Sequence, residues 1–544
     1  MASRLSPETR EANLAALASA DVDVLVVGGG ITGAGVARDA ALRGLSVALV
    51  ERTDWAAGTS SRSSKLIHGG VRYLQQGDLG LVREAAAERG VLRRVAPHLT
   101  VPLRVVLPTY GLAMHTKLGL GLWTFERVAA LPGEERHETW SRTEAIDREP
   151  TLDGARLHGA IVYTEYLTDD ARLVLDTVKG AHEAGALCVN HLEAVAFSAG
   201  PVTTEVMLRD TLTGTTWQAR GRVVVNAAGP WVDEVRRRAG ALAGPRLHLT
   251  KGVHLVVARE RLPVRHMVAM PAHDRRTVFA VPRGSCTYLG TTDTDYGAPA
   301  DQPEVTAADA DYLLEAANRT FVGPPLTRRD VIGAWAGLRP LLHEEGKRPT
   351  EISRKDEILT AGATSLVSVA GGKLTTHRRM AERVVDEVGR RLGRESAPCR
   401  TDTVPLPGGE LTPEELLLLE RTLRQRLPRL PPGGAERLVQ LYGAGCQRLL
   451  ARVDADPAAA EPVGGQRDVP RAEIEQVLEE EMALTLEDIL ERRTRLLPFD
   501  TRQGLDGAEA VAALAAARLG WNAKRTEAEL AAYRSLAASL RRFP

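Results

Sequence analysis

The chain has 544 residues, of which 44% are hydrophobic and 26% charged, ordinary values for a soluble globular protein. This length exceeds what one hydrophobic core supports, so two or three domains are expected. Lys plus Arg and Asp plus Glu each total 70, and this balance gives no support for nucleic-acid binding.

The four cysteines lie far apart without CxxC spacing. This argues against a zinc site or a disulfide framework and fits a reducing cytosol. Residues 1–20 lack the apolar core of a signal peptide, and no run of about 18 apolar residues predicts a spanning helix. The chain is therefore expected in the cytoplasm, and peripheral attachment to a membrane surface stays open.

Residues 22–51, VDVLVVGGGITGAGVARDAALRGLSVALVE, predict a buried strand, a helix and a second strand. The glycines of GxGxxG allow a tight turn, close approach of a pyrophosphate and close packing of helix on strand. Glu51 closes the second strand, where an acid can bind a ribose diol. An ordinary βαβ unit with a glycine-rich turn is the alternative. The predicted dinucleotide contacts are Gly28, Gly30, Ile31, Thr32, Gly33, Glu51 and Arg52.

A long polar loop, TDWAAGTSSRSSKLIHGGVRYLQQGD, follows from residue 53 to 78. Loops of this length are often functional. A helix is expected over 79–96. The apolar stretch 101–127, with scattered bases, predicts either a core strand followed by a helix or a basic amphipathic surface that touches anionic lipid.

Further along, a helix is expected over 168–186, then strands over 187–197, 202–210 and 216–225. Antiparallel strands of a second domain are expected over 252–258, 277–282 and 286–292. The dinucleotide fold is resumed near Gly229 and Gly371, each time as a strand, a turn of small residues and a helix. Such interruption is more typical of flavin domains than of simple nicotinamide domains.

After Cys399 a Pro/Gly-rich linker leads into helical periodicity over 413–544, without a catalytic pattern. The predicted division assigns 20–100, 155–245 and 335–395 to a discontinuous dinucleotide-binding domain. It assigns 101–154 and 246–334 to a substrate domain, and 405–544 to a helical C-terminal domain. This last third reads as a cap or an interaction module.

The chain contains 62 Arg and only 8 Lys. Where Arg is so strongly preferred, a Lys is a candidate for a role that needs a compact ammonium. Lys65, Lys251 and Lys373 lie beside glycine-rich or hydroxyl-rich turns. Chance under a biased composition is the alternative.

Taken in order, the motifs GGGITGAG, SSRSSKLIHGGVRYL, DDARLVLD, NAAGPWV, KGVH, GTTDTDY, GLRPLL and GGKLTTHR resemble the aerobic FAD-dependent glycerol-3-phosphate dehydrogenases. The resemblance runs from Val22 to Leu392 and is less specific in the tail. It implies an α/β FAD-binding Rossmann-like domain, an inserted antiparallel-sheet (α+β) substrate domain and an all-helical C-terminal domain.

The resemblance also implies oxidation of sn-glycerol 3-phosphate to dihydroxyacetone phosphate. A hydride would pass from carbon 2 to the flavin, and electrons would pass on to a membrane quinone. The alcohol proton needs a base and the phosphate needs fixed cations. A homodimer stays open.

By the same resemblance, His68 is the expected base, with His254 and His377 as lesser competitors. Arg72, Tyr73, Arg339 and Lys373 are the expected substrate contacts, and Arg339 is also placed near the reacting hydroxyl. An ordinary surface or ion-pair arginine is the alternative for either Arg. The remaining expected FAD contacts are Thr59, Ser60, Ser61, Ser64, Lys65, Leu66, Gly229, Gly371, Gly372, Lys373, Leu374 and Thr375.

Thr292 and Asp293 are expected near the site without an assigned role. Two enzymatic alternatives stay open: a glycerol-3-phosphate oxidase that uses O2 and makes H2O2, and a flavin amine or amino-acid oxidase. The second is disfavoured because a carboxylate needs one Arg, whereas the cationic set suits a dianion.

Overall fold

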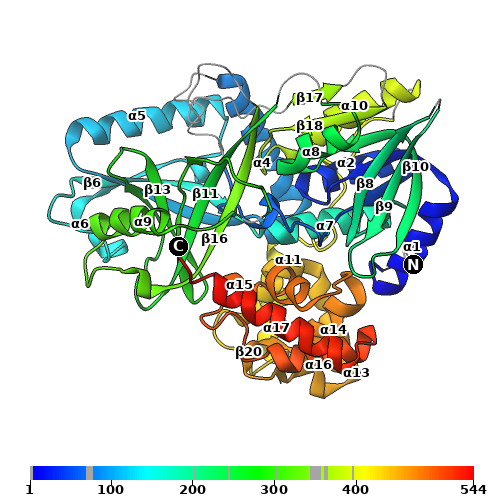
Figure 1. Cartoon of the computed structure of the whole chain (residues 1–544). Helices are drawn as coiled ribbons and strands as arrows, with labels where there is room; N and C mark the ends of the chain where they lie inside the picture. The colour runs from blue at the N-terminus through cyan, green and yellow to red at the C-terminus, as the bar shows by residue number, and fades with distance from the viewer. Residues whose placement is uncertain are drawn as a thin grey trace.

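The computed structural model of the chain describes residues 4–68, 78–200, 202–242, 246–301, 303–342, 357–360, 365–394 and 397–543. Two large sheets stand side by side, and a helical unit, orange to red in Figure 1, packs beneath them. The first sheet carries the glycine motif, so it positions the predicted dinucleotide site.

The first sheet has the strand order β17-β18-β10-β1-β2-β7, and its neighbours from β18 to β7 are parallel. β17 adds an antiparallel edge, and β8 and β9 extend the sheet from β10. The strands are β1 (Asp21–Val27), β2 (Val47–Val50), β7 (Leu187–Val189), β8 (Leu192–Ala199), β9 (Thr204–Asp210), β10 (Thr216–Asn226), β17 (Glu357–Thr360) and β18 (Leu366–Ala370).

Helices cover both faces of this sheet. Three helices, α2, α7 and α10, pack on one face, over Val24 and Val26. Helix α1 packs on the other face, over Leu25. Successive strand residues point to opposite faces, so burial on both sides explains an uninterrupted apolar strand. The helices are α1 (Pro7–Ser19), α2 (Ile31–Leu42), α7 (Asp170–Glu183), α8 (Val232–Arg238) and α10 (His377–Leu392).

The second sheet has the order β15-β11-β14-β13-β12-β4-β6-β3, with β16 paired to β11 and β5 to β6. Except for the parallel β12–β4 pair, its ladders are antiparallel. The strands are β3 (Leu66–Ile67), β4 (Val101–Thr109), β5 (Glu138–Ser141), β6 (Gly159–Leu167), β11 (Leu247–Ala258), β12 (Met267–Pro271), β13 (Thr277–Arg283), β14 (Cys286–Gly290), β15 (Thr294–Asp295) and β16 (Val331–Leu342).

Helix α9 packs on this sheet, and its Leu313 joins Val253 and Leu255 in a common core. Helix α5 lies over β4 and β6. The helices of this half are α5 (Leu112–Val128), α6 (Arg142–Arg148) and α9 (Ala307–Thr320). Helix α4 (Leu79–Val95) contributes to both halves, because Val82 packs with Leu122 of α5 and Leu92 joins the core of the first sheet.

The C-terminal unit is helical and has its own core, to which Leu423, Ile474 and Val511 belong. A π-helical turn, η8 (Asp488–Arg493), faces the first sheet and contacts α7. The other elements are α11 (Pro413–Arg426), α12 (Gly434–Tyr442), α13 (Cys446–Ala455), β19 (Pro462–Val463), β20 (Gln466–Pro470), α14 (Arg471–Glu480), α15 (Leu496–Phe499), α16 (Ala508–Leu519) and α17 (Ala523–Ser539).

The predicted fold class is confirmed, and so are the helices expected over 79–96 and 168–186. The strand and helix expected within 101–127 are β4 and α5. Helix α5 nevertheless leaves large apolar side chains in solvent: Leu112 is 67% exposed, Leu120 63% and Trp123 50%. The helix therefore also carries the surface that the amphipathic interpretation requires.

Sheet membership differs from the predicted division at three places, of which the two-residue strand β3, within the predicted segment 20–100, is the shortest. Strands β6 and β16 both belong to the antiparallel sheet, although residues 155–245 and 335–395 were assigned to the dinucleotide-binding domain. Strand β6 pairs with all nine residues of β4, and β16 pairs along β11. An apolar strand does not reveal which sheet it joins, because its partners lie far away along the chain.

Candidate active site

The glycine turn after β1 brings helix α2 against the first sheet. A Cβ on Gly33 would lie 1.8 Å from the carbonyl oxygen of Gly28, so only glycine permits this approach. Gly28 itself has φ +112°, a backbone conformation that favours glycine. The start of α2 therefore lies open toward a cavity, where its N–H groups and helix dipole favour an anion.

Glu51 lies at the carboxyl end of β2, beside this turn. Its Oε2 accepts from the Gly29 N–H at 2.7 Å, and its Oε1 accepts from the Thr53 N–H at 2.9 Å. The Thr53 hydroxyl also donates to Oε1, at 3.0 Å. These three bonds fix the carboxylate at the cavity wall, and Oε2 keeps a lone pair for a ribose hydroxyl.

The cavity beside the turn has a volume of about 580 Å³, within the range of small-molecule sites. It extends from Glu51, past the start of α2, to β16 and the turn before α10. The predicted site residues that line it are Gly28, Gly30, Ile31, Thr32, Glu51, Arg52, Thr59, Ser60, Gly229, Gly371, Gly372, Lys373 and Leu374.

Loop 59–64 closes the cavity against β16. The Thr59 hydroxyl donates to the Leu338 carbonyl at 2.7 Å, and the Ser60 hydroxyl accepts from the Ile31 N–H at 3.1 Å. A Cβ on Gly337 would lie 2.5 Å from the Arg62 carbonyl oxygen, so strand and loop touch through their backbones. Arg62 and Ser63 line the cavity as well, although no motif singled them out.

Lys65 lies behind this loop rather than in the cavity wall. Its Nζ donates to the Asp170 carboxylate and to the Ser61 carbonyl, both at 2.8 Å, and both ion-pair side chains are fully buried. Burial lowers the pKa of Lys65 to about 8. The ammonium thus anchors the loop to the start of α7. Leu66 lies in β3, paired with Leu167.

Ser64 contacts the second sheet through His254. The Ser64 Oγ lies 2.9 Å from His254 Nε2, and the imidazole stacks on Trp335 with ring centroids 4.9 Å apart. Burial, with the nearby Arg339 and Lys65 charges, holds the pKa of His254 well below its usual range. This imidazole is neutral and orients the Ser64 hydroxyl.

Arg339 lies on β16 between two cavity-lining residues, Leu338 and Pro340. Its Nη1 donates to Asp293 Oδ1 at 2.9 Å, and its Nη2 donates to Thr291 Oγ1 at 3.1 Å and to the Thr292 carbonyl at 3.2 Å. The guanidinium is therefore fixed in orientation. Asp293, expected near the site without a role, is its carboxylate partner.

A second glycine turn precedes α10. Gly371 and Gly372 have φ values of +76° and +93°, which a side chain would strain. The turn brings Lys373 and Leu374 into the cavity wall. The next residue, Thr375, accepts at Oγ1 from the His68 N–H at 3.1 Å, so His68 lies at this end of the site.

His377, a lesser candidate for the base, lies at the start of α10, behind α2. Its Nδ1 is 2.8 Å from the Leu374 carbonyl oxygen, and burial lowers its pKa to about 4. The predicted substrate contacts Arg72 and Tyr73 fall within 69–77, outside the described residues.

At the Glu51 end, Arg52 forms a bridge across the cavity mouth that no motif indicated. Its guanidinium lies 4.2 Å from the ring centroid of Trp231 and pairs with Asp301 at 2.5 Å. The Trp231 Nε1–H also donates to Asp301, at 2.9 Å. All three residues line the cavity.

A family model described as FAD dependent oxidoreductase matches residues 23–378, and one described as the C-terminal domain of alpha-glycerophosphate oxidase matches residues 399–526. The aerobic glycerol-3-phosphate dehydrogenase of Bacillus subtilis (strain 168) is 40% identical over 519 residues, which cover 92% of each chain. This chain belongs to the aerobic glycerol-3-phosphate dehydrogenase family of FAD-dependent oxidoreductases. The Staphylococcus haemolyticus member is 38% identical over 513 residues, covering 92% of this chain and 91% of its own.

Solved structures agree with this membership. The glycerol-3-phosphate dehydrogenase from Bacillus halodurans, complexed with FAD, superposes with a TM-score of 0.82 at 34% identity, covering 99% of this chain and 98% of its own. L-alpha-glycerophosphate oxidase from Mycoplasma pneumoniae, with FAD bound, reaches 0.56 at 19% identity over 71% of this chain and 99% of its own, a likeness of fold alone.

The enzyme is FAD-dependent, and the geometry of the cavity fits this cofactor. The start of α2 would receive the pyrophosphate, Glu51 a ribose hydroxyl, and the turn at 371–374 the opposite end of the molecule. Among the described residues, no helix has both the length and the hydropathy needed to cross a membrane.

Proposed function

We propose that this enzyme oxidises sn-glycerol 3-phosphate to dihydroxyacetone phosphate and passes the electrons to a quinone. Relatives that share 37–40% of their residues with this chain over more than nine-tenths of its length are named aerobic glycerol-3-phosphate dehydrogenases. The structural observation that carries the proposal is the fixed guanidinium of Arg339 beside the cavity end formed by Leu338 and Lys373.

Two cations, Arg339 and Lys373, suit a phosphate dianion. Arg339 would contact the substrate, and Lys373 would add charge from the turn before α10. We assign Arg72 and Tyr73 to the same task on the strength of the family resemblance. Bound FAD would supply the hydride acceptor, so these residues serve to hold carbon 2 toward it.

We assign to His68 the role of the base that accepts the proton of the alcohol hydroxyl. Its backbone is tied to Thr375 at the Lys373 end of the site, and its side chain is exposed. The competing imidazoles are buried: His254 is engaged by Ser64, and His377 by the Leu374 carbonyl. An exposed imidazole at this end can accept the hydroxyl proton and release it to solvent.

The test is a spectral titration of the purified holoenzyme without oxygen. Glycerol 3-phosphate should bleach the absorbance of the bound flavin, and a quinone analogue should restore it. Glycerol and a 2-hydroxy acid are the control compounds, because they lack the phosphate and should leave the spectrum unchanged. Flavin that stays oxidised with glycerol 3-phosphate would contradict the proposal.

An oxidase that uses O2 is the second candidate, because the C-terminal unit matches the model for alpha-glycerophosphate oxidase. An oxidase would form one H2O2 per glycerol 3-phosphate in air, without an added acceptor. A dehydrogenase would turn over slowly in air and speed up when the quinone analogue is added. A peroxide assay in both conditions separates the two activities.

We also propose that α5 contacts the membrane that holds the quinone. Leu112, Leu120 and Trp123 are exposed, and the Arg127 guanidinium lies 5.2 Å from the Trp123 ring. Apolar side chains beside a base suit an anionic bilayer surface. The enzyme should sediment with anionic liposomes at low salt, and a variant with Leu120→Ser and Trp123→Ser should bind less.

The matched control for α5 is a variant with Leu417→Ser and Leu418→Ser. These leucines lie on α11, 58% and 63% exposed, so the control removes similar apolar area from a different surface. Equal loss of sedimentation in the two variants, or no binding of the unaltered enzyme at low salt, would refute contact through α5.

A further inference from the structure

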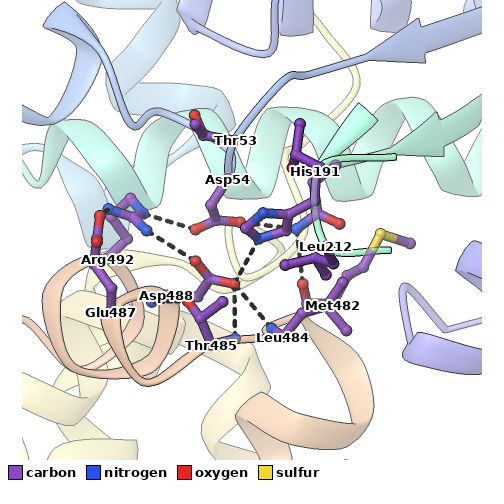
Figure 2. Close-up of polar contacts among 12 residues, drawn as sticks. Thr53, Asp54, His191, Leu212, Met482, Leu484, Thr485, Glu487, Asp488 and Arg492 are labelled. Atoms are coloured by element: carbon purple, nitrogen blue, oxygen red, sulfur yellow. Dashed lines mark hydrogen bonds and ion pairs between the residues drawn. The ribbon is translucent and has the colours of Figure 1, made fainter. Parts of the chain in front are cut away.

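Asp54 is a fully buried carboxylate that receives two guanidinium groups from the helical C-terminal unit. Figure 2 shows one of them, that of Arg492. Arg493 binds it with two bonds, Nη1 to Oδ2 at 2.6 Å and Nη2 to Oδ1 at 2.8 Å. Arg492 Nε donates to Oδ2 at 2.8 Å. Asn190 Nδ2 donates to Oδ1 at 3.0 Å, so four donors surround one carboxylate.

A second ion pair crosses the same interface. His191 Nε2 lies 3.0 Å from Asp488 Oδ2, and Arg492 Nη2 donates to Asp488 Oδ1 at 2.8 Å. The N–H groups of Leu484 and Thr485 donate to Asp488 as well, as Figure 2 shows. Asp488 is thus held from both units.

Asp54, His191 and Asp488 also have the spacing of a metal site, with ligand atoms within 4.8 Å of one another. Their bonding favours a different interpretation. Each carboxylate oxygen already accepts from a guanidinium, an imidazole, an amide or a backbone N–H, and a guanidinium lies beside each carboxylate. The cluster is an ion-pair network between units.

Asp54 follows the acid of the cofactor site by three residues, and the segment 51–56 around it contacts the glycine turn. The Thr53 N–H donates to Glu51, and the Ala56 N–H donates to the Gly29 carbonyl at 3.0 Å. Trp55 is fully buried against Gly29, where an added Cβ would lie 2.6 Å from the indole. Any shift of Asp54 therefore reaches both Glu51 and Gly29.

The opposite side of this segment is fixed by the strand connection that carries His191. The His191 N–H donates to the Thr53 carbonyl and the Leu192 N–H to the Glu51 carbonyl, both at 2.6 Å. His191 in turn is held by Asp488. The C-terminal unit thus holds residues 51–56 through Asp54 and through His191.

We propose that Arg492 and Arg493 are positioning residues for FAD, acting through Asp54 on the ribose acid Glu51 and on the pyrophosphate turn at Gly29. Removing one partner of a buried ion pair leaves an uncompensated charge, which moves toward water or collects new partners. Here the displaced group is Asp54, so the cofactor site loses its shape although no FAD contact has been deleted.

The rival interpretation is that the network only docks the helical unit. Docking alone predicts lower thermal stability of the apoprotein with unchanged affinity for FAD. Positioning predicts weaker FAD binding and faster FAD release beyond any loss of stability. Titration of apoprotein with FAD, followed by flavin fluorescence, and the rate of FAD release from holoprotein distinguish the two.

The variants are Asp54→Asn, which keeps the shape of the side chain, and Arg493→Lys, which keeps the charge but loses the two-pronged contact. In the full chain, we expect each to raise the FAD dissociation constant by about tenfold. A variant that folds, judged by circular dichroism, yet is purified without flavin meets the same expectation. A double variant that carries both substitutions should have an FAD dissociation constant no higher than that of the single variant that binds FAD less tightly. The reason is that Asp54 and Arg493 act as one unit.

Arg437→Lys is the matched control. Arg437 also binds a buried carboxylate with two bonds, to Glu473, but both residues lie inside the C-terminal unit. This variant should keep the FAD dissociation constant within about twofold of the unaltered enzyme. The proposal is overturned if Asp54→Asn and Arg493→Lys bind FAD normally, or if Arg437→Lys weakens FAD to the same extent.

Discussion

Arg339 and Asp293 form an ion pair at the edge of the cavity, with Nη1 2.9 Å from Oδ1. The guanidinium also lies directly over Gly252, where an added Cβ would be 2.3 Å from Nη2. The Asp293 carboxylate binds one side of the guanidinium, and the backbone of Gly252 lies against it. Together they hold the cation in one orientation. The strength of this constraint can be measured.

The first prediction concerns the positive charge of Arg339 and its fixed orientation. Arg339→Leu should lower kcat/KM for glycerol 3-phosphate by about 100-fold or more, because a charge-assisted contact to the phosphate is lost. Asp293→Asn should lower it by about tenfold, since the cation stays but loses its fixed orientation. Steady-state kinetics at equal flavin content measure both. Unchanged kinetics in a flavin-loaded Arg339→Leu enzyme would remove Arg339 from the site.

The second prediction concerns the glycine turn. Gly33→Ala should abolish FAD binding, because the new methyl group would lie 1.8 Å from a backbone oxygen and must push α2 off the sheet. Gly90→Ala, in helix α4, has nothing within 4 Å of the added Cβ and should be neutral or slightly stabilising. The flavin absorbance per protein of the two purified variants measures the difference. Flavin retained in Gly33→Ala would show that the start of α2 can move to accommodate the methyl group without loss of FAD binding.

The third prediction concerns Lys65, whose ammonium is buried against Asp170. Lys65→Met should destabilise the fold by about 3 kcal/mol, because Asp170 loses its 2.8 Å ammonium partner and keeps the more distant Arg495, at 3.5 Å, as its cationic partner. Lys524→Met, at an exposed position on α17, is the matched control and should change little. Thermal unfolding of the two variants provides the comparison. Equal midpoints would mean that water or another cation replaces the ammonium.

The fourth prediction is a dependence on pH. Burial opposes the charged form of His191, but Asp488 raises its pKa above the usual value. A raised folded pKa contributes stability that is fully present below about pH 6 and is lost as the pH rises through the folded pKa. The stability difference between the unaltered enzyme and His191→Gln should therefore be larger at pH 6 than at pH 9. Thermal midpoints at both values test this, and a constant difference would contradict it.

The sequence alone predicts the features that are local. The strand, glycine turn, helix and Glu51 follow one another within 22–51, so their spacing alone indicates how they fold. The same holds for the turn at Gly371 and Gly372. Long-range pairing cannot be inferred from such local patterns, which is why the sequence did not indicate that β6 and β16 join the antiparallel sheet.

Lys65 shows the same limit at the level of one side chain. Its place in a hydroxyl-rich loop predicted a cofactor contact, and a preference for Arg elsewhere made the lysine stand out. The partner that holds its ammonium, Asp170, is 105 residues away. Arg493 and Asp54 are separated by 439 residues, and a helical stretch without a catalytic pattern gave no indication of their contact.

The cavity wall is assembled from stretches that begin at Val27 and end at Glu487. During synthesis on the ribosome, the last of these residues is added when nearly nine-tenths of the chain exists. The ion pairs of Asp54 form later still, after Arg492 and Arg493 have been synthesised. We therefore expect the nascent polypeptide to have no affinity for FAD through most of its elongation, so that the flavin is acquired only by a nearly finished chain.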